Sequence, residues 1–435
     1  MAKKKIAIYW MRRDLRLEDN AALWQALRSA YPVLTIFIFD CNILHKLANK
    51  RDARVLFIHR ELQHLKSELE KMGSTLRTFY CTPAEAYSQL MQEFDIQAVH
   101  ASRDYEPYAQ LRDKEIFQQL AVPNIPFKGA KDHVIFEKEE VMKDDGKPYT
   151  VYTPYSRKWK QKLNEFYIKP YPTEEYFGNY FQCDPLSMHT LEQIGFEDFQ
   201  FSFPERIADE SILVNYEKTR DLPAVSGTSR LSMHLRFGTV SIRQLVGIAQ
   251  RTSDKWLNEL IWRDFYQMIL FHFPHTAEAA FKPGYDRIAW MNDEKQFDRW
   301  CTGQTGYPLV DAGMRELNST GFMHNRVRMV VASFLTKHLL IDWRWGERYF
   351  AEKLLDYECA SNVGGWQWAA GCGCDAAPYF RIFNPQSQTE KFDKDLKYIR
   401  HWVPELNTTT YPAPMVDHKF ARERCLNVFK KALSQ

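Results

Sequence analysis

The first 130 residues alternate between short apolar runs and longer segments with helical periodicity, and this alternation is the feature that most restricts the fold. Residues 54–72 place apolar side chains at helical spacing and end at Gly73, and Pro83 is suited to the first turn of another helix. Runs this short are typical of strands buried on both faces, so the pattern predicts a doubly wound parallel sheet. The four runs lie at residues 6–11, 33–39, 76–81 and 98–101.

The rest of the chain has a different character. Residues 131–205 are rich in Tyr, Pro, Lys and Phe and show little periodicity, which indicates a long surface connection. Beyond them the periodicity is helical, in segments at residues 241–250, 256–273, 308–319 and 324–340. We therefore expect an α/β domain over residues 1–130, an interdomain linker over 131–205 and an all-helical domain over 206–435.

Composition excludes several classes of protein. No apolar run approaches the roughly 20 residues that span a bilayer, and the N-terminus MAKKKIAIYW lacks a signal-peptide pattern, so we expect a soluble, cytoplasmic protein. The first strand leads into MRRDLRLEDN without a Gly-rich fingerprint, which disfavours a nicotinamide dehydrogenase. Cys372 and Cys374 lack the second pair or histidine of a zinc site, so we interpret them as buried thiols and expect no metal. The net charge of +3 does not by itself indicate a polyanionic partner.

Aromatic residues make up 14% of the chain and include twelve tryptophans. Because a buried indole N–H needs a partner, so many tryptophans suggest stacking platforms or redox residues, with core packing as the alternative for any single one. In residues 258–267, Glu259 and Trp262 share one helical face, where a carboxylate beside an indole could bind a base. An amphipathic helix with a core tryptophan is the simpler reading of that segment taken alone.

Two further segments carry polar groups in informative positions. In residues 227–241, Gly227 permits a tight turn and is followed by hydroxyls that suit a phosphate, although ordinary helix capping gives the same pattern. In residues 320–335, Asn325, Arg328 and Met329 share a helical face, and Arg326 points elsewhere. An arginine in an apolar helix requires an anionic partner, for which Asp356 is a candidate.

These segments, together with RRDLRLEDNAAL, WRWGERYF at 343–350 and GGWQWAAGCGCDAAPYFRIFNP at 364–385, closely resemble the photolyase/cryptochrome family. The resemblance covers nearly the whole chain and is strongest to class I photolyases of cyclobutane pyrimidine dimers. It implies an α/β antenna domain, a linker and a helical domain that holds FAD. It also implies a deoxyribodipyrimidine photo-lyase, in which excited reduced FAD transfers an electron to a dimer flipped out of single- or double-stranded DNA. We expect a monomer that binds UV-damaged DNA and no membrane.

The resemblance assigns a set of residues to the flavin. Asn362 resembles the residue that faces flavin N5, where plant-type cryptochromes carry aspartate, so the asparagine favours repair over signalling. Glu358 departs from the aspartate of many relatives. The expected FAD-binding residues are Tyr216, Thr228, Ser229, Leu231, Ser232, Arg263, Arg328, Asp356, Glu358 and Asn362.

A second set resembles the dimer pocket and the electron-transfer chain. Glu259 would steady the carbonyl charge that develops on the dimer, and only His324 stands where (6-4) photolyases carry two histidines. The expected substrate-binding residues are Arg220, Glu259, Trp262, Asn325, Arg326, Met329 and Trp368. The expected catalytic residues are Glu259, Asn362, Trp290, Trp343 and Trp366, the three tryptophans forming the path that photoreduces the flavin.

The antenna chromophore and the competing functions remain open. Folate-binding relatives carry an Asn–Glu pair where this chain has Tyr108 and Ala109, which disfavours folate and leaves a deazaflavin, a second flavin or no antenna. Residues 12–14 could touch such a ligand, and the basic residues within 391–402 could contact DNA phosphates. The main alternative function is a signalling cryptochrome, which usually carries a C-terminal extension. A flavoprotein without light chemistry is a third alternative, for which no nicotinamide site is visible.

Overall fold

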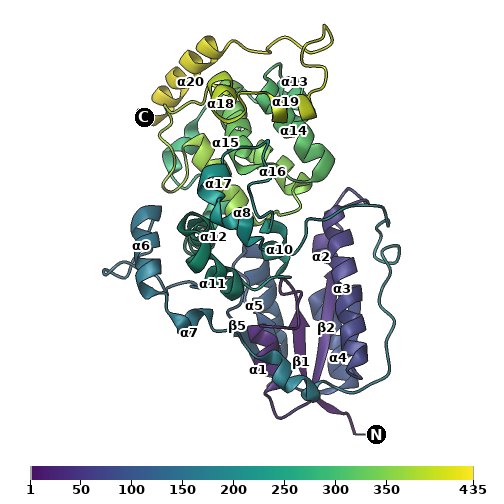
Figure 1. Cartoon of the computed structure of the whole chain (residues 1–435). Coiled ribbons are helices and arrows are strands. Elements are labelled where there is room, and N and C mark those ends of the chain that lie inside the picture. Colours follow the sequence, from purple (N-terminus) through teal and green to yellow (C-terminus); the bar gives the residue numbers. More distant parts are fainter. Residues whose placement is uncertain (1, 435) are drawn as a thin grey trace. The chain divides into compact units, whose positions relative to one another are not determined.

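The computed structural model describes residues 2–434, which form two compact units (Figure 1). The first unit contains the chain up to Glu137 together with Leu163–Ala208 and Arg230–Ile248. The second contains Lys138–Lys162, Asp209–Ser229 and the chain from Ala249 onwards. Residues 131–205 therefore contribute to both units, and the three-domain division of the chain stays a prediction.

The first unit is built on a five-stranded parallel sheet of order β3-β2-β1-β4-β5, which confirms the predicted α/β class. Successive strands run outward from β1 to β3, and the chain then returns to the other side of β1. Ligands of open α/β sheets bind beside such a reversal, at the carboxyl ends of the strands. The strands are β1 (Lys5–Met11), β2 (Val33–Asp40), β3 (Leu76–Cys81), β4 (Asp95–Ser102) and β5 (Phe127–Ala130).

Capping residues stabilise the ends of the helices in this unit. The Asp52 side chain accepts a hydrogen bond from the backbone of Arg54, and Thr82 with Glu85 forms a capping box at Pro83. Gly73 follows α3 with φ of +76°, a conformation that favours glycine. The helices are α1 (Ala21–Leu27), α2 (Cys41–Leu44), α3 (Ala53–Lys71), α4 (Pro83–Glu93), α5 (Pro107–Ala121), α7 (Glu165–Ile168), α10 (Ser232–Phe237) and most of α11 (Ile242–Thr252), with a 3-10 helix at Thr173–Asn179.

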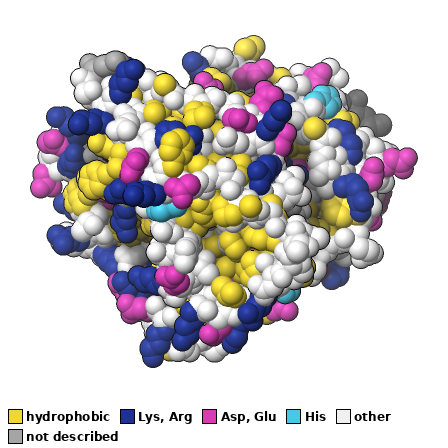
Figure 2. All heavy atoms as spheres, turned by 90° about the horizontal axis from the view of Figure 1, so that it is seen from above, with side chains coloured by type: hydrophobic (Ala, Val, Ile, Leu, Met, Phe, Trp, Pro, Cys, Tyr) yellow, Lys and Arg dark blue, Asp and Glu magenta, His cyan; other side chains and the backbone are white. Residues whose placement is uncertain are grey.

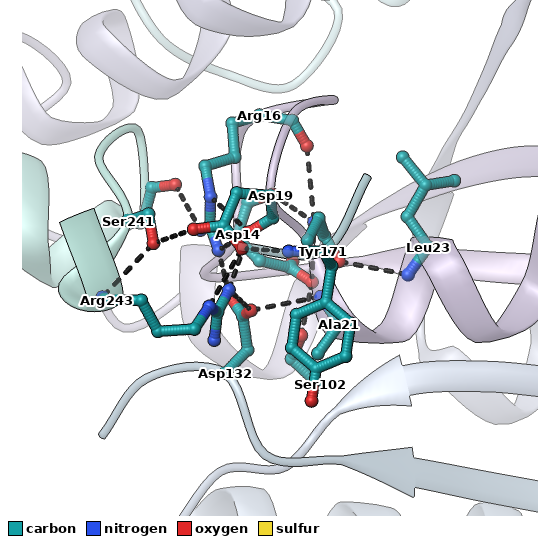
Figure 3. A network of polar contacts seen from close by, with 12 residues as sticks. Asp14, Arg16, Asp19, Ala21, Leu23, Ser102, Asp132, Tyr171, Ser241 and Arg243 are labelled. Atoms are coloured by element: carbon teal, nitrogen blue, oxygen red, sulfur yellow. Dashed lines mark hydrogen bonds and ion pairs between the residues drawn. The ribbon is translucent and has the colours of Figure 1, made fainter. Parts of the chain in front are cut away.

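A buried ionic network joins distant segments of the first unit (Figure 3). Asp132 is 2% exposed and accepts hydrogen bonds from Arg16 at 2.6 Å and from Arg243 at 2.8 Å. Arg243 also binds Asp19 at 2.8 Å and lies over the Tyr171 ring. Burial by itself would raise the pKa of Asp132, but the two arginines hold it well below its usual range. The network therefore fixes the start of α11 to the loop after β1.

The second unit is helical, as predicted. Helices α14, α15, α16 and α17 contribute to a large apolar cluster in its core, in which Trp300 and Phe334 are fully buried. The predicted helix at residues 324–340 is observed as α15 followed by a π-helical turn at Phe334–His338. The α-helices are α6 (Tyr152–Lys162), α8 (Glu210–Val214), α9 (Tyr216–Thr219), α12 (Asp254–His272), α13 (Glu294–Cys301), α14 (Pro308–Thr320), α15 (Asn325–Ser333), α16 (Trp343–Lys353), α17 (Cys359–Ala370), α18 (Pro385–Phe392), α19 (Lys397–Trp402) and α20 (His418–Leu433). Short 3-10 helices lie at Pro274–Ala277 and Pro283–Arg287.

Residues 131–205 contain secondary structure that the sequence analysis did not predict. Helix α6 buries Tyr155 and Trp159, and the Trp159 indole N–H donates to Asp264 at 3.0 Å. This buried aromatic packing explains why a segment without clear periodicity is nevertheless ordered. Cys372 and Cys374 are buried thiols, as predicted. Within residues 2–434, no helix has both the length and the apolar character needed to cross a bilayer.

Candidate functional site

Helix α12 of the second unit presents an aromatic platform centred on Trp262. The Tyr152 ring lies parallel to the Trp262 indole, with centroids 3.7 Å apart and an interplanar angle of 4°. Tyr266 packs at 5.4 Å and Phe265 makes an edge contact at 5.6 Å. Trp262, which was predicted as a stacking residue, is partly exposed and is held by these three aromatic neighbours. The contact with Tyr152 was not predicted.

Glu259 lies one turn before Trp262 on the same helix and forms an ion pair with Arg220. Burial raises the pKa of the Glu259 carboxyl, and the Arg220 guanidinium opposes that rise only in part. The guanidinium also lies over the Tyr216 ring, 5.5 Å from its centroid. The structure thus brings together four of the residues that the sequence assigned to flavin and lesion binding.

Opposite charges alternate from Glu259 to the start of α15. Arg220 approaches Asp221 at 3.9 Å, and Asp221 accepts a hydrogen bond from Arg326 at 2.8 Å. Arg326 also lies over the Phe392 ring at 4.3 Å, and its Nη1 is 3.9 Å from the Met329 sulfur. Both arginines that were predicted to contact DNA are therefore paired with carboxylates, which sequence reasoning did not foresee.

Arg328 lies two residues beyond Arg326 and turns to a different partner. Its Nη2 donates to Asp356 at 2.9 Å, and its Nε donates to the Met323 carbonyl at 2.7 Å. The predicted pairing of Arg328 with Asp356 is confirmed. Asn325 opens the same helix and is exposed, whereas Met329 is half-buried.

Helix α17 carries the amide that was predicted to face the flavin. The Asn362 side-chain nitrogen donates to Glu347 on α16, at 2.9 Å to the carboxylate and 3.1 Å to the backbone carbonyl. Burial raises the pKa of Glu347, and the hydrogen bond from Asn362 opposes that rise only in part. Glu358, just before α17, accepts a hydrogen bond from Arg263 at 2.7 Å. Glu347 carries no distinctive sequence signal and was missed.

The three predicted redox tryptophans share one apolar cluster. Trp343 and Trp366 are each 2% exposed, and Trp290 packs against the cluster while partly exposed. The Trp366 ring contacts Phe350 at 5.0 Å and Trp300 at 6.1 Å. The order of electron transfer among these residues remains a prediction.

The predicted phosphate segment spans the boundary between the two units. Thr228 and Ser229 belong to the second unit and are half-buried. Leu231, which is buried, and Ser232, which is exposed, belong to the first. At Gly227 an added Cβ would lie 2.5 Å from the Thr219 Cβ, so the local packing requires glycine there. The role of this segment in phosphate binding stays a prediction.

Two polar groups of the second unit, on Asn362 and Arg328, are suited to an isoalloxazine ring. The Asn362 nitrogen is committed to Glu347, and its oxygen receives no hydrogen bond from any described residue, which leaves an acceptor for a flavin N–H. Arg328 makes no hydrogen bond through Nη1 within the described chain and offers a donor to a carbonyl or phosphate. Amide acceptors and guanidinium donors are the groups that a flavin requires.

The predicted antenna loops lie at the carboxyl ends of the strands in the first unit. Arg12 donates to Asp113 at 2.5 Å and to the Ser102 carbonyl, and its guanidinium lies 4.8 Å from the Trp10 ring centroid. Tyr108, at the position of the folate-binding amide, donates to Asp40 at 2.5 Å. Because Arg12 and Tyr108 are each hydrogen-bonded to another residue of the first unit, the geometry adds no support for folate.

The face drawn in Figure 2 exposes apolar side chains near its centre, with both basic and acidic side chains around them. An apolar surface of this kind is typical of a binding site rather than of a fully solvated face.

Comparison with known proteins identifies the family. Residues 7–175 match the family described as DNA photolyase, and residues 256–410 match the FAD binding domain of DNA photolyase. A deoxyribodipyrimidine photo-lyase of Vibrio cholerae is 39% identical, with 98% of this chain and 99% of that protein covered.

Solved structures agree with this match along the whole chain. A bacterial class III photolyase from Agrobacterium tumefaciens has a TM-score of 0.88 at 33% identity, covering 100% of this chain and 99% of the other. An archaeal photolyase from Sulfolobus tokodaii, solved with two FAD molecules, has a TM-score of 0.85 at 34% identity, covering 98% and 99%. The class within the family remains a prediction. The chain belongs to the photolyase/cryptochrome family and contains its FAD-binding domain.

Proposed function

We propose that this protein repairs cyclobutane pyrimidine dimers in DNA with blue light, acting as a deoxyribodipyrimidine photo-lyase. The observation that carries the proposal is the grouping of Glu259, Arg220 and the Trp262 platform on one side of α12. A base-sized π-face beside a carboxylate and a guanidinium matches an extruded dimer, which stacks poorly in the duplex and flips out at reduced energetic cost. The names of full-length relatives support the same substrate.

Each group in the lesion site has a distinct task. Trp262 stacks one base of the dimer, and Trp368, which is half-buried on α17, stacks the other. Glu259 hydrogen-bonds the pyrimidine edge, and its raised pKa favours the protonated form that can donate to a carbonyl. Arg220 and Arg326 bind the phosphates that flank the dimer and exchange their carboxylate partners for DNA.

The flavin-side residues hold and tune the cofactor. When bound, reduced FAD that absorbs blue light supplies an electron to the dimer and regains it after the cyclobutane ring opens. Asn362 provides an amide oxygen whose orientation is fixed by Glu347, and Arg328 with Asp356 provides a partly buried charge pair. Trp366, Trp343 and Trp290 provide the path through which an oxidised flavin is photoreduced before repair. A second chromophore in the first unit would extend light capture.

Substrate choice tests this proposal. Reduced, FAD-loaded protein is illuminated with three oligonucleotides that carry a thymine cyclobutane dimer, a (6-4) product or no lesion, and the products are separated by chromatography. We expect conversion of the first only. Conversion of the (6-4) product alone would replace the proposed substrate, and conversion of neither would favour a signalling cryptochrome.

A further inference from the structure

The rings of Tyr152 and Trp262 lie parallel and in close contact. Their 3.7 Å centroid separation and 4° angle are those of two rings in full van der Waals contact. A ring stacked in this way covers one face of the indole. A base can therefore stack on Trp262 only at the opposite face.

Tyr152 is itself fixed by hydrogen bonds at both of its ends. Its hydroxyl donates to the Asn258 carbonyl at 2.9 Å and lies 3.1 Å from the Asn258 side-chain oxygen. Its backbone N–H donates to Asp375 at 3.0 Å, and an edge contact with Phe265 at 5.8 Å packs the ring from the side. Asn258 stands four residues before Trp262, so the tyrosine is anchored on the same helix as the indole that it covers.

We infer that Tyr152 is a positioning residue for lesion recognition, which holds the plane of Trp262 so that its free face receives one base of the extruded dimer. The inference rests on the proposed function. An indole already fixed in its binding orientation loses less conformational freedom when a base stacks on it, so preorganisation raises lesion affinity. Undamaged duplex DNA does not enter this site and gains nothing from the contact.

The opposite role would be a gate, with Tyr152 occupying the place of a base until DNA displaces it. Displacement would break the hydroxyl bond to Asn258 and the packing against Phe265. These anchors favour a permanent support, and the two roles change lesion affinity in opposite directions.

Dark binding measurements separate the roles. FAD-loaded Tyr152→Phe, Tyr152→His and Tyr152→Leu variants are titrated with an oligonucleotide that carries one thymine dimer and with its undamaged counterpart. Tyr149→Leu is the matched control. Tyr149 lies three residues before Tyr152 in the same segment and packs against the Tyr155 ring. Flavin absorbance reports cofactor content in each variant.

We expect Tyr152→Leu to weaken dimer binding by about 3- to 10-fold, the range of one lost aromatic pair, with binding of undamaged DNA unchanged. Tyr152→Phe should stay within about twofold of the parent because it keeps the stack, and Tyr152→His should fall between. If Tyr152→Leu fails to fold, the comparison of dimer affinity between Tyr152→Phe and Tyr152→His tests the inference, and weaker binding by the His variant supports it. Unchanged or tighter dimer binding in both Tyr152→Leu and Tyr152→His would overturn the inference. A parent protein that does not distinguish the two oligonucleotides would overturn the proposed function as well.

Discussion

Glu259 and Arg220 form an ion pair one helical turn before the aromatic platform of Trp262. Their side chains are 30% and 26% exposed, so the pair is open enough to exchange with a ligand. A carboxylate paired with arginine cannot donate a hydrogen bond, whereas the protonated acid can. Binding of DNA phosphate to Arg220 would remove the pairing and increase the raised pKa of Glu259 further.

Replacement of Glu259 tests this relationship. We expect Glu259→Ala to lower the repair yield about tenfold, the effect of one lost hydrogen bond to a developing charge, while FAD content changes little. Glu259→Gln keeps a donor and should lose less. Glu217→Ala is the control, because Glu217 is 70% exposed and pairs only at 3.6 Å with Lys255. Loss of FAD in Glu259→Ala would instead assign the residue to flavin binding.

Trp343→Phe separates photoreduction from repair. Phenylalanine keeps most of the packing of this buried residue but is far harder to oxidise, so photoreduction of oxidised FAD should stop. Protein reduced chemically beforehand should repair at the parent rate. Trp345→Phe on the same helix is the matched control, because Trp345 packs against Phe297 at 5.2 Å. Photoreduction at the parent rate in Trp343→Phe, with loss in Trp345→Phe, would contradict the proposed path and redirect it through Trp345.

Gly346→Ala tests how closely α16 packs on Trp366. The added Cβ would lie 2.1 Å from Cη2 of Trp366 and 2.6 Å from a Leu335 methyl, so the indole must move. We expect a loss of about 1–3 kcal/mol in unfolding free energy, measured in urea, together with slower photoreduction. Gly247→Ala is the control, since no atom lies within 4 Å of its added Cβ, and it should be neutral or stabilising. Equal stability of the two variants would contradict the packing described.

Asp132→Asn tests the buried ionic network of the first unit. At neutral pH the loss of its charge leaves Arg16 and Arg243 undercompensated, which should destabilise the unit by about 3–5 kcal/mol. Because the folded-state pKa of Asp132 is depressed, its stabilisation is complete above the ordinary aspartate pKa of 3.8 and is lost as the pH falls below it. Denaturant titrations of the parent should therefore show this loss, and those of the variant should show less of it.

The exposed Asp198 supplies the control for that experiment. Its side chain is 76% exposed and lies 3.5 Å from Arg60, so Asp198→Asn should change stability by less than about 0.5 kcal/mol. A similar loss in both variants would indicate a general charge effect and not the buried network.

The fold could be predicted wherever one periodicity dominated. The range of β3 was predicted residue for residue, and α3 and α12 were predicted to within two residues at each end. The four-residue β5 was missed because a run so short gives no period. Helix α6 was missed because its order depends on buried aromatic contacts with α12, which are tertiary.

The site could be predicted in part, because family motifs identify residue types but not their partners. The need to neutralise an arginine in an apolar helix made Asp356 a candidate partner, and the family resemblance implied its pairing with Arg328, which the structure shows. The pairings of Arg220 with Glu259 and of Asn362 with Glu347 join residues 39 and 15 positions apart in the chain, and no local pattern indicates them. Tyr152 was missed for the same reason, since its partner lies more than 100 residues away.

Restoration of thymine under blue light is the most direct test of the central claim. Pre-reduced protein and an oligonucleotide with one thymine cyclobutane dimer are illuminated beside an identical dark sample, and restored thymines are counted by chromatography. The proposed function predicts two thymines restored for each dimer lost in the light and none in the dark. An intact dimer after illumination, in protein that binds FAD and reduces it under light, would contradict the assignment.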